Sequence, residues 1–135
     1  MSKNVVMMTA VQVPGWEHRS KPYRYGIDSF KKWCDKNDCE FFLLDELIVP
    51  HEDMKINFQR YYVYELLEQS GIDYNQICIT DADCIIHPDC PNFFELTDRK
   101  FTAFRDMDNL KWVYESVEGY NDMFEPFIFD MSKYF

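Results

Sequence analysis

The 135-residue sequence lacks an apolar run of the ~18 residues that a membrane span needs. Its first residues, MSKNVVMMTAV, contain only a short apolar run, so we expect no secretory signal. Basic residues are scarce, because 14 Lys and Arg stand against 24 Asp and Glu, giving a net charge of −10. This balance argues against a surface for nucleic acid or anionic membranes, which needs clustered basic side chains.

The sequence also lacks a Cys-x-x-Cys pair, and its cysteines are odd in number: Cys34, Cys39, Cys78, Cys84 and Cys90. This pattern favours a reduced chain and a cytoplasmic location over a disulfide framework. Cys84, His87 and Cys90 do have a C-x-x-H-x-x-C spacing that three zinc ligands can adopt. A fourth ligand is not evident, and the apolar run around Cys84 favours a core position for its thiol.

Apolar and aromatic residues are abundant, at 47% and 18% of the chain. A chain of this size can bury on the order of two-thirds of its unfolded surface. No internal repeat, low-complexity tract or interdomain linker is visible. We therefore expect residues 1–135 to form a single domain.

Three apolar runs predict strands: Asn4–Val11, Cys39–Asp45 and Gln76–Asp83. The first two are continuous rather than alternating, which is typical of strands covered on both faces. Helical spacing of apolar residues predicts a helix after Pro22 and a second one between the later strands. The resulting β-α-β-α-β order predicts an α/β fold with a mostly parallel, Rossmann-like sheet and helices on both faces.

The second helix is expected to run from about Lys55 to a stop at Gly71. Its apolar face would carry Phe58, Tyr62, Val63, Leu66 and Leu67. Gln59 and Arg60 are expected to point elsewhere. Lys55 and Arg60 could reach a diphosphate from the start of this helix, although charged residues on a helix are often simply solvated.

The rest of the chain gives a less regular pattern. We expect a loop and a short helical turn within Pro88–Thr97, followed by a strand over Lys100–Met107. Asn109–Tyr120 has a partly helical pattern, and Glu125–Phe129 is a last apolar run that predicts a strand.

Two carboxylates, Asp81 and Asp83, follow the short apolar run of the third strand. In open α/β sheets, ligands bind outside the carboxyl ends of the strands. A pair of acids there can hold Mg²⁺ or Mn²⁺, which typically combine one or two carboxylates with substrate phosphates. The alternative is an acidic surface turn with no ligand.

The loop that leaves the first strand lies on the same expected ligand side. Thr9 and Ala10, at the end of that strand, and Trp16 and Arg19, in the loop, are therefore candidates for ligand contact. For Trp16 the alternative is a loop anchor packed on the body of the domain.

Three segments of the chain resemble a known protein family. The segments KINFQRYYVYELLEQSGIDYNQI and ITDADCIIHPDCPNFFEL, and the later PFIFDMSKYF, resemble the GT-A fold of nucleotide-sugar glycosyltransferases around their D-x-D motif. Domains of this family commonly continue well beyond this length. The resemblance therefore implies the N-terminal, nucleotide-binding portion of that fold, incomplete at its C-terminus.

The resemblance also implies site roles. Asp83 would bind Mn²⁺ or Mg²⁺ directly, and Asp81 would bind the metal or the ribose. Thr9 and Ala10 would lie against the nucleotide base. Lys55 or Arg60 would contact the nucleotide or its diphosphate.

The implied reaction is a metal-dependent transfer of a sugar from a nucleoside-diphosphate sugar to a glycan, protein or small-molecule acceptor. The metal would stabilise the leaving nucleoside diphosphate. The catalytic base stays open among several acids of the C-terminal third: Asp106, Asp108, Glu115, Asp122 and Glu125.

Two other functions compete with this interpretation. One is a non-catalytic nucleotide-sugar-binding or interaction domain of the same fold, with Trp112, Tyr114 and Tyr120 as a contact surface. The other is a phosphatase of the haloacid-dehalogenase type, which also uses D-x-D. In that family the motif follows the first strand, whereas here it follows the third.

Overall fold

The computed structural model describes residues 2–103, 111 and 115. By its internal contacts the chain divides into two units, Met1–Phe101 and Thr102–Phe135. All helices and strands with described bounds belong to the first unit. In the second unit, Lys111 and Glu115 are helical, and their side chains form an ion pair with a distance of 3.6 Å between Nζ and Oε1.

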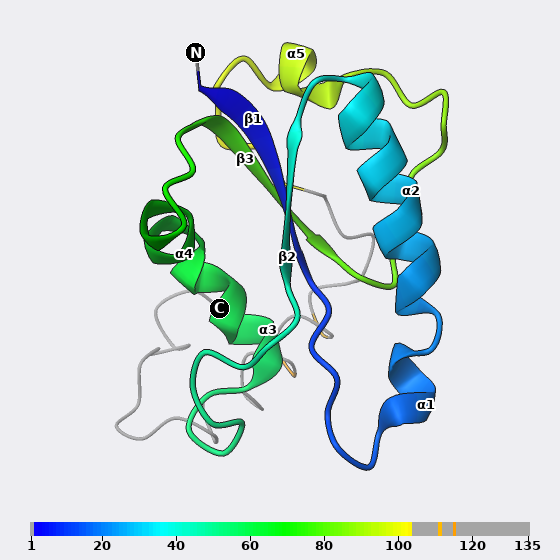
Figure 1. Ribbon diagram of the computed structural model, residues 1–135, viewed down its shortest axis with the longest axis vertical. Coiled ribbons are helices and arrows are strands. Elements are labelled where there is room, and N and C mark those ends of the chain that lie inside the picture. The colour runs from blue at the N-terminus through cyan, green and yellow to red at the C-terminus, as the bar shows by residue number, and fades with distance from the viewer. Residues whose placement is uncertain (1, 104–110, 112–114, 116–135) are drawn as a thin grey trace. The chain divides into compact units, whose positions relative to one another are not determined.

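A parallel sheet in the order β2-β1-β3 forms the centre of the first unit (Figure 1), with β1 at Lys3–Thr9, β2 at Glu40–Leu44 and β3 at Tyr74–Asp81. The register pairs Thr9 with Leu44 on one side and with Asp81 on the other. All three strands therefore end at one edge of the sheet. The predicted α/β fold with a parallel sheet is confirmed.

Helices cover both faces of this sheet (Figure 1): α1 (Glu17–Ser20), α2 (Tyr23–Lys36), α3 (Ile56–Gln59), the 3₁₀ helix η1 (Arg60–Tyr62), α4 (Val63–Gln69) and α5 (Phe93–Thr97). The predicted helix from Lys55 is thus one α-3₁₀-α segment. It ends before Gly71, whose φ of 67° is left-handed, as expected for the residue just past a helix.

The central strand β1 explains why its apolar run is continuous. Successive side chains of a strand point to opposite faces. Val6 and Met8 pack in a cluster with α2 and α5, whereas Val5 and Met7 pack in a second cluster with α4. All four side chains are fully buried, so β1 is apolar on both faces from Val5 to Met8.

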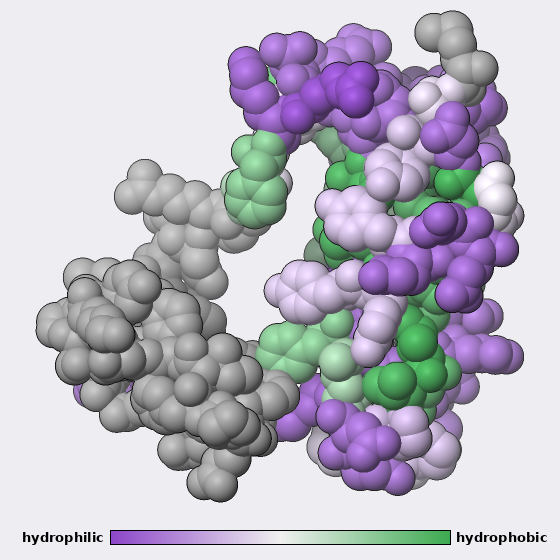
Figure 2. Space-filling view, turned by 90° about the vertical axis from the view of Figure 1, so that its left-hand side faces the viewer, coloured by the Kyte–Doolittle hydropathy of each residue, from purple (hydrophilic) through white to green (hydrophobic). Residues whose placement is uncertain are grey.

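The segment η1–α4 is apolar on one side only. Val63 and Leu67 are buried against the sheet, while Tyr61 and Tyr64 are exposed. Figure 2, which views the side on which α4 lies, shows hydrophilic and pale residues interspersed with smaller apolar areas. The helix is therefore amphipathic, as its sequence pattern predicts.

The third strand lies two residues earlier in the chain and is less buried than expected. It ends at Asp81 rather than Asp83, and Ile79 is 39% exposed. After a turn at 82–83, the apolar residues Cys84–Ile86 do not continue a strand. This segment leaves the sheet and packs along α2.

Gly26 allows that packing. A Cβ atom at this position would clash with the carbonyl oxygen of Ala82 and would lie 2.6 Å from that of Cys84. One turn later, the Ser29 hydroxyl accepts a hydrogen bond from the backbone N–H of Ile86 at 3.2 Å. The backbone on both sides of Asp83 is therefore held directly against α2.

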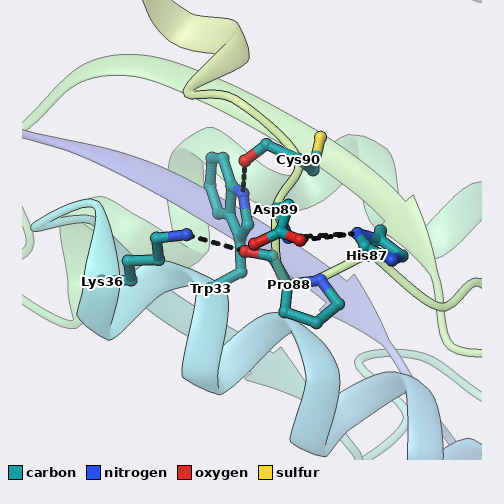
Figure 3. Close-up of polar contacts among 6 residues, drawn as sticks. All are labelled: Trp33, Lys36, His87, Pro88, Asp89 and Cys90. Atoms are coloured by element: carbon teal, nitrogen blue, oxygen red, sulfur yellow. Dashed lines mark hydrogen bonds and ion pairs between the residues drawn. The ribbon is translucent and has the colours of Figure 1, made fainter.

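The chain continues along α2 after this turn (Figure 3). The indole Nε1 of Trp33 donates a hydrogen bond to the carbonyl of Cys90 at 2.9 Å. Lys36 Nζ donates to the carbonyl of Pro88 at 2.8 Å. The imidazole of His87 accepts a bond from the N–H of Asp89 instead of reaching the pocket described below. Residues 87–90 thus connect the end of the sheet to α5.

The predicted helical turn within Pro88–Thr97 is confirmed as α5. The Asn92 side chain caps it by accepting a hydrogen bond from the Phe94 N–H at 3.2 Å. Gln76 of β3 fixes the same helix, because its amide donates to the Phe94 carbonyl and accepts from Thr97 Oγ1. Phe93 stacks on Trp33 with ring centroids 4.5 Å apart, which closes the core on this side.

The remaining predictions fall mostly outside the described residues. Of the strand expected over Lys100–Met107, residues 100–103 are described and are not a strand, so that part was wrong. Outside the described residues lie 104–107, most of Asn109–Tyr120 with its aromatic side chains, and all of Glu125–Phe129. Within the described part of the chain, no helix is long and apolar enough to cross a membrane.

We predict that Gly26→Ala destabilises the protein. An alanine in place of glycine normally stabilises a helix interior by up to about 1 kcal/mol. Here the clash with two backbone carbonyls should reverse the sign and lower the free energy of unfolding by about 1–3 kcal/mol. Denaturant unfolding measures this, with Asp28→Ala on the exposed face of α2 as the control. A Gly26→Ala variant as stable as the wild type would contradict the close packing.

Candidate functional site

A pocket of about 480 Å³ lies where the strands end, within the size range of small-ligand sites. Its lining comes from four segments of the chain. These are the end of β1 with its loop, the α1–α2 region, the β2–α3 loop with the start of the next helix, and the end of β3 with its turn. The position matches the ligand side of open parallel sheets.

Five of the six predicted site residues line this pocket: Thr9, Lys55, Arg60, Asp81 and Asp83. Ala10 does not. Its N–H donates to the carbonyl of Leu44 at 2.8 Å, which continues the alternation of β1. The Ala10 side chain therefore points into the core on the α2 side, where it is 7% exposed.

The loop candidates Trp16 and Arg19 also line the pocket. Trp16 is 52% exposed, so it is not the buried loop anchor considered as the alternative. The Arg19 guanidinium lies 4.6 Å from the centre of the Trp16 ring, a cation–π arrangement that places a charge beside the pocket. The two acids that follow β2, Asp45 and Glu46, are exposed and do not belong to the lining.

The charge of the pocket differs from that of the chain. Three cationic side chains, Arg19, Lys55 and Arg60, line it together with two carboxylates, Asp81 and Asp83. With histidine neutral, the lining is slightly positive, whereas the whole chain carries −10. An anionic ligand is therefore better accommodated here than over the average surface of this protein.

Arg60 and Asp81 form the main ion pair of the pocket. An Nη atom of Arg60 donates to Oδ1 of Asp81, with side-chain exposures of 21% and 53%. Two buried polar atoms of the lining, the Thr9 hydroxyl and the Arg60 Nε, have no hydrogen-bond partner in the described part of the chain. A buried polar group without a partner costs about 1–3 kcal/mol, so a ligand that satisfied both would gain affinity.

The donor set fits a hard cation that is shared with a ligand. Asp81 and Asp83 provide carboxylate oxygens, which Mg²⁺ and Mn²⁺ prefer. Among residues 2–103, 111 and 115, no three His, Cys, Asp or Glu side chains are grouped to hold an ion by themselves. The protein would therefore depend on oxygens of the ligand, such as phosphates, to complete the coordination. The zinc spacing of Cys84, His87 and Cys90 does not bring these side chains together as a site.

Gln59 is a structural residue that the sequence pattern misplaced. We expected it on the outer face of its helix, but it is fully buried. Its side-chain oxygen accepts hydrogen bonds from the N–H groups of Ile48 and Val49, at 2.7 and 3.3 Å. Its amide nitrogen donates to the carbonyls of Val49 and Met54, both at 3.0 Å. These bonds shape the loop that brings His51 and Lys55 to the pocket.

Sequence reasoning missed other lining residues: Val11, Val13, Ser20, Tyr23, His51, Ile56, Asn57 and Ala82. Most lie within one turn of a residue that was predicted, so position at the strand ends was a usable signal. His51 had no such signal, because it lies in the middle of a loop. Comparison of the chain with protein-family models, curated proteins and solved structures gives no match.

The cysteine environments differ sharply around the acidic turn. Cys84 is exposed, so its expected core position was wrong. Cys34 and Cys78 lie in or against the core on the α2 side. Burial raises the pKa of the Cys34 thiol to about 12 and that of Cys78 to about 11. Only the thiolate reacts readily, so these two thiols should be inert at neutral pH.

We predict that Gln59→Leu loosens the β2–α3 loop. The substitution removes four hydrogen bonds and leaves buried backbone groups without partners, at about 1–3 kcal/mol for each unsatisfied group. The free energy of unfolding should fall by several kcal/mol in total, and the Ile48 and Val49 amides should exchange hydrogen faster. Gln69→Leu, at the exposed end of α4, is the control. Equal effects of the two variants would rule out the proposed role of Gln59.

We also predict that Cys84 is the fastest thiol to react with a neutral disulfide reagent in the native protein. Cys84→Ser should remove the fast phase of labelling, and Cys34→Ser should leave it unchanged. Quantitative thiol labelling at neutral pH, before and after unfolding, measures both. A fast phase that survives in Cys84→Ser would show that the turn after β3 is not exposed as described.

Proposed function

We propose that the chain binds a nucleoside-diphosphate sugar in this pocket and acts as a metal-dependent glycosyltransferase of the GT-A type. The observation that carries the proposal is the meeting of Asp81 and Asp83 with three cationic side chains where parallel strands end. Carboxylates suit a divalent cation, and cationic side chains suit phosphate oxygens. A diphosphate with its cation is a ligand that needs both.

Each residue has a distinct part in this proposal. Asp83, in the turn after β3, would hold Mn²⁺ or Mg²⁺ together with Asp81. Lys55, just before α3, and Arg60, just after it, would bind the diphosphate. The Thr9 hydroxyl, which has no partner within the described residues, would donate to an oxygen of the nucleotide.

The chemistry then follows from charge. When bound, the cation neutralises the nucleoside diphosphate as it leaves the sugar. Lys55 and Arg60 add positive charge at the same place, and their part is strongest where solvent is excluded. The acceptor would be a glycan, a protein or a small molecule. The free cysteines suit a reducing compartment such as the cytoplasm.

A second candidate is binding of the nucleotide sugar without transfer. Within the described lining, the two carboxylates are Asp81 and Asp83, and both are assigned to the cation. His51 is the imidazole of that lining and the remaining group there that could accept a proton from an acceptor. A domain that only bound the nucleotide sugar in this pocket would need no proton acceptor there.

We predict that Mn²⁺ and a nucleoside diphosphate stabilise the protein together, and that Asp83→Asn abolishes this. At a concentration of 100 Kd a ligand stabilises the native state by about 2.7 kcal/mol. Thermal unfolding with UDP or GDP, each with and without Mn²⁺, measures the effect. Asp83→Asn should unfold at the wild-type temperature without ligand, because the Asp83 side chain is exposed.

The matched control is Asp89→Asn, an exposed acid in the same loop that pairs with His87 outside the pocket. It should retain the stabilisation by nucleotide and metal. Absence of stabilisation in the wild type with every nucleotide would refute the proposal. Turnover of an aryl phosphate would favour the phosphatase, and binding without sugar transfer or donor hydrolysis would favour the recognition domain.

A further inference from the structure

Arg60 and a bound cation would compete for the same carboxylate. Arg60 is the first residue of η1, between α3 and α4. Its Nη donates to Oδ1 of Asp81, 21 residues further along the chain and at the end of a different element. Asp81 is also one of the two carboxylates assigned to the cation. The two positive partners cannot both use this oxygen without strong mutual repulsion.

Arg60 has unused capacity for another partner. A guanidinium group has five N–H donors in a planar fork that matches a phosphate. One Nη bonds Asp81, and the buried Nε has no hydrogen-bond partner within the described residues. The side chain also lines the pocket beside Lys55, so it already faces the space that a diphosphate would fill.

The backbone at this point is fixed while the charged group is partly free. Gln59, the preceding residue, is fully buried and holds four backbone hydrogen bonds. The Arg60 side chain is 21% exposed and Asp81 is 53% exposed. A rotation of the terminal guanidinium would redirect it toward a ligand while the backbone stays in place. The carboxylate of the pair is about half exposed, and solvent weakens the ion pair on that side enough for exchange.

We propose that Arg60 is an exchangeable counter-ion of Asp81. In the free protein it neutralises Asp81, and it moves to a phosphate of the ligand when the cation takes that carboxylate. This inference rests on the proposed function and deepens it, because it predicts how the pocket couples its two ligands. The cation alone binds poorly, since it must displace Arg60. The diphosphate alone binds poorly, since Arg60 stays with Asp81. Together they bind cooperatively.

The test is whether Arg60→Gln changes the affinities for Mn²⁺ and for the nucleotide in opposite directions. Calorimetric titration with MnCl₂ alone should show Mn²⁺ binding about fivefold tighter than in the wild type, because an exposed ion pair no longer competes. Titration with UDP or GDP in saturating Mn²⁺ should show binding weakened about tenfold or more, because a charge-assisted hydrogen bond to phosphate is lost. Arg60→Lys, which keeps the charge but not the fork, should change both affinities in the same directions by less.

Arg24→Gln is the matched control. Arg24 bonds the hydroxyl of its neighbour Tyr25 on the exposed side of α2 and does not line the pocket. Neither affinity should change in this variant. Thermal unfolding of each variant without ligand separates a binding effect from a folding defect, and Arg60→Lys takes over the test if Arg60→Gln does not fold.

Three results would overturn the inference. If both affinities fall in Arg60→Gln, Arg60 only holds Asp81 in place. If neither changes, Arg60 is a solvated charge. If the wild type binds neither UDP nor GDP with Mn²⁺, the proposed function fails and the inference fails with it. The first two results leave the binding of nucleotide and metal by the wild type intact, so the two failures are distinguishable.

Discussion

The contact between α2 and the turn after β3 positions the acidic residues of this protein. The backbone of Ala82 and Cys84 lies so close to α2 that no side chain fits at Gly26. Asp81 is fixed by its pairing with Thr9 in the sheet, and Asp83 is fixed because the residues on either side of it rest on the helix. Both carboxylates thereby face the same pocket, although β3 itself ends between them.

Local charge is the second constraint. A chain of net charge −10 repels anions over most of its surface, so a phosphate needs a place where this sign is reversed. Three of the 14 Lys and Arg residues meet two carboxylates in the pocket, from three separate segments of the chain. The ion pair with Asp81 holds the positive charge of Arg60 beside the space for a ligand. The proposed recognition thus needs both the carboxylates and the cationic side chains.

Position at the strand ends located most of the candidate site, but not the orientation of each side chain. Thr9, Asp81 and Asp83 were predicted from it, because parallel strands deliver their ends to one edge. This rule could not distinguish the orientation of the Ala10 side chain from that of Thr9. The Ala10 side chain points into the core because the alternation of β1 continues through this residue. Gln59 was misplaced because a polar residue beside an arginine gives no sign that its amide will meet four backbone groups.

The sequence by itself determined the three-strand parallel α/β order, the start of α2 and the end of α4, because periodicity and helix-stopping residues act over a few neighbours. Tertiary structure decided which of these elements' side chains meet. Register between strands and the close approach at Gly26 depend on atoms tens of residues apart, and the burial of Gln59 depends on a loop that begins 11 residues before it. The pairing of Arg60 with Asp81 is of this kind, since no local pattern relates a helix start to a strand end.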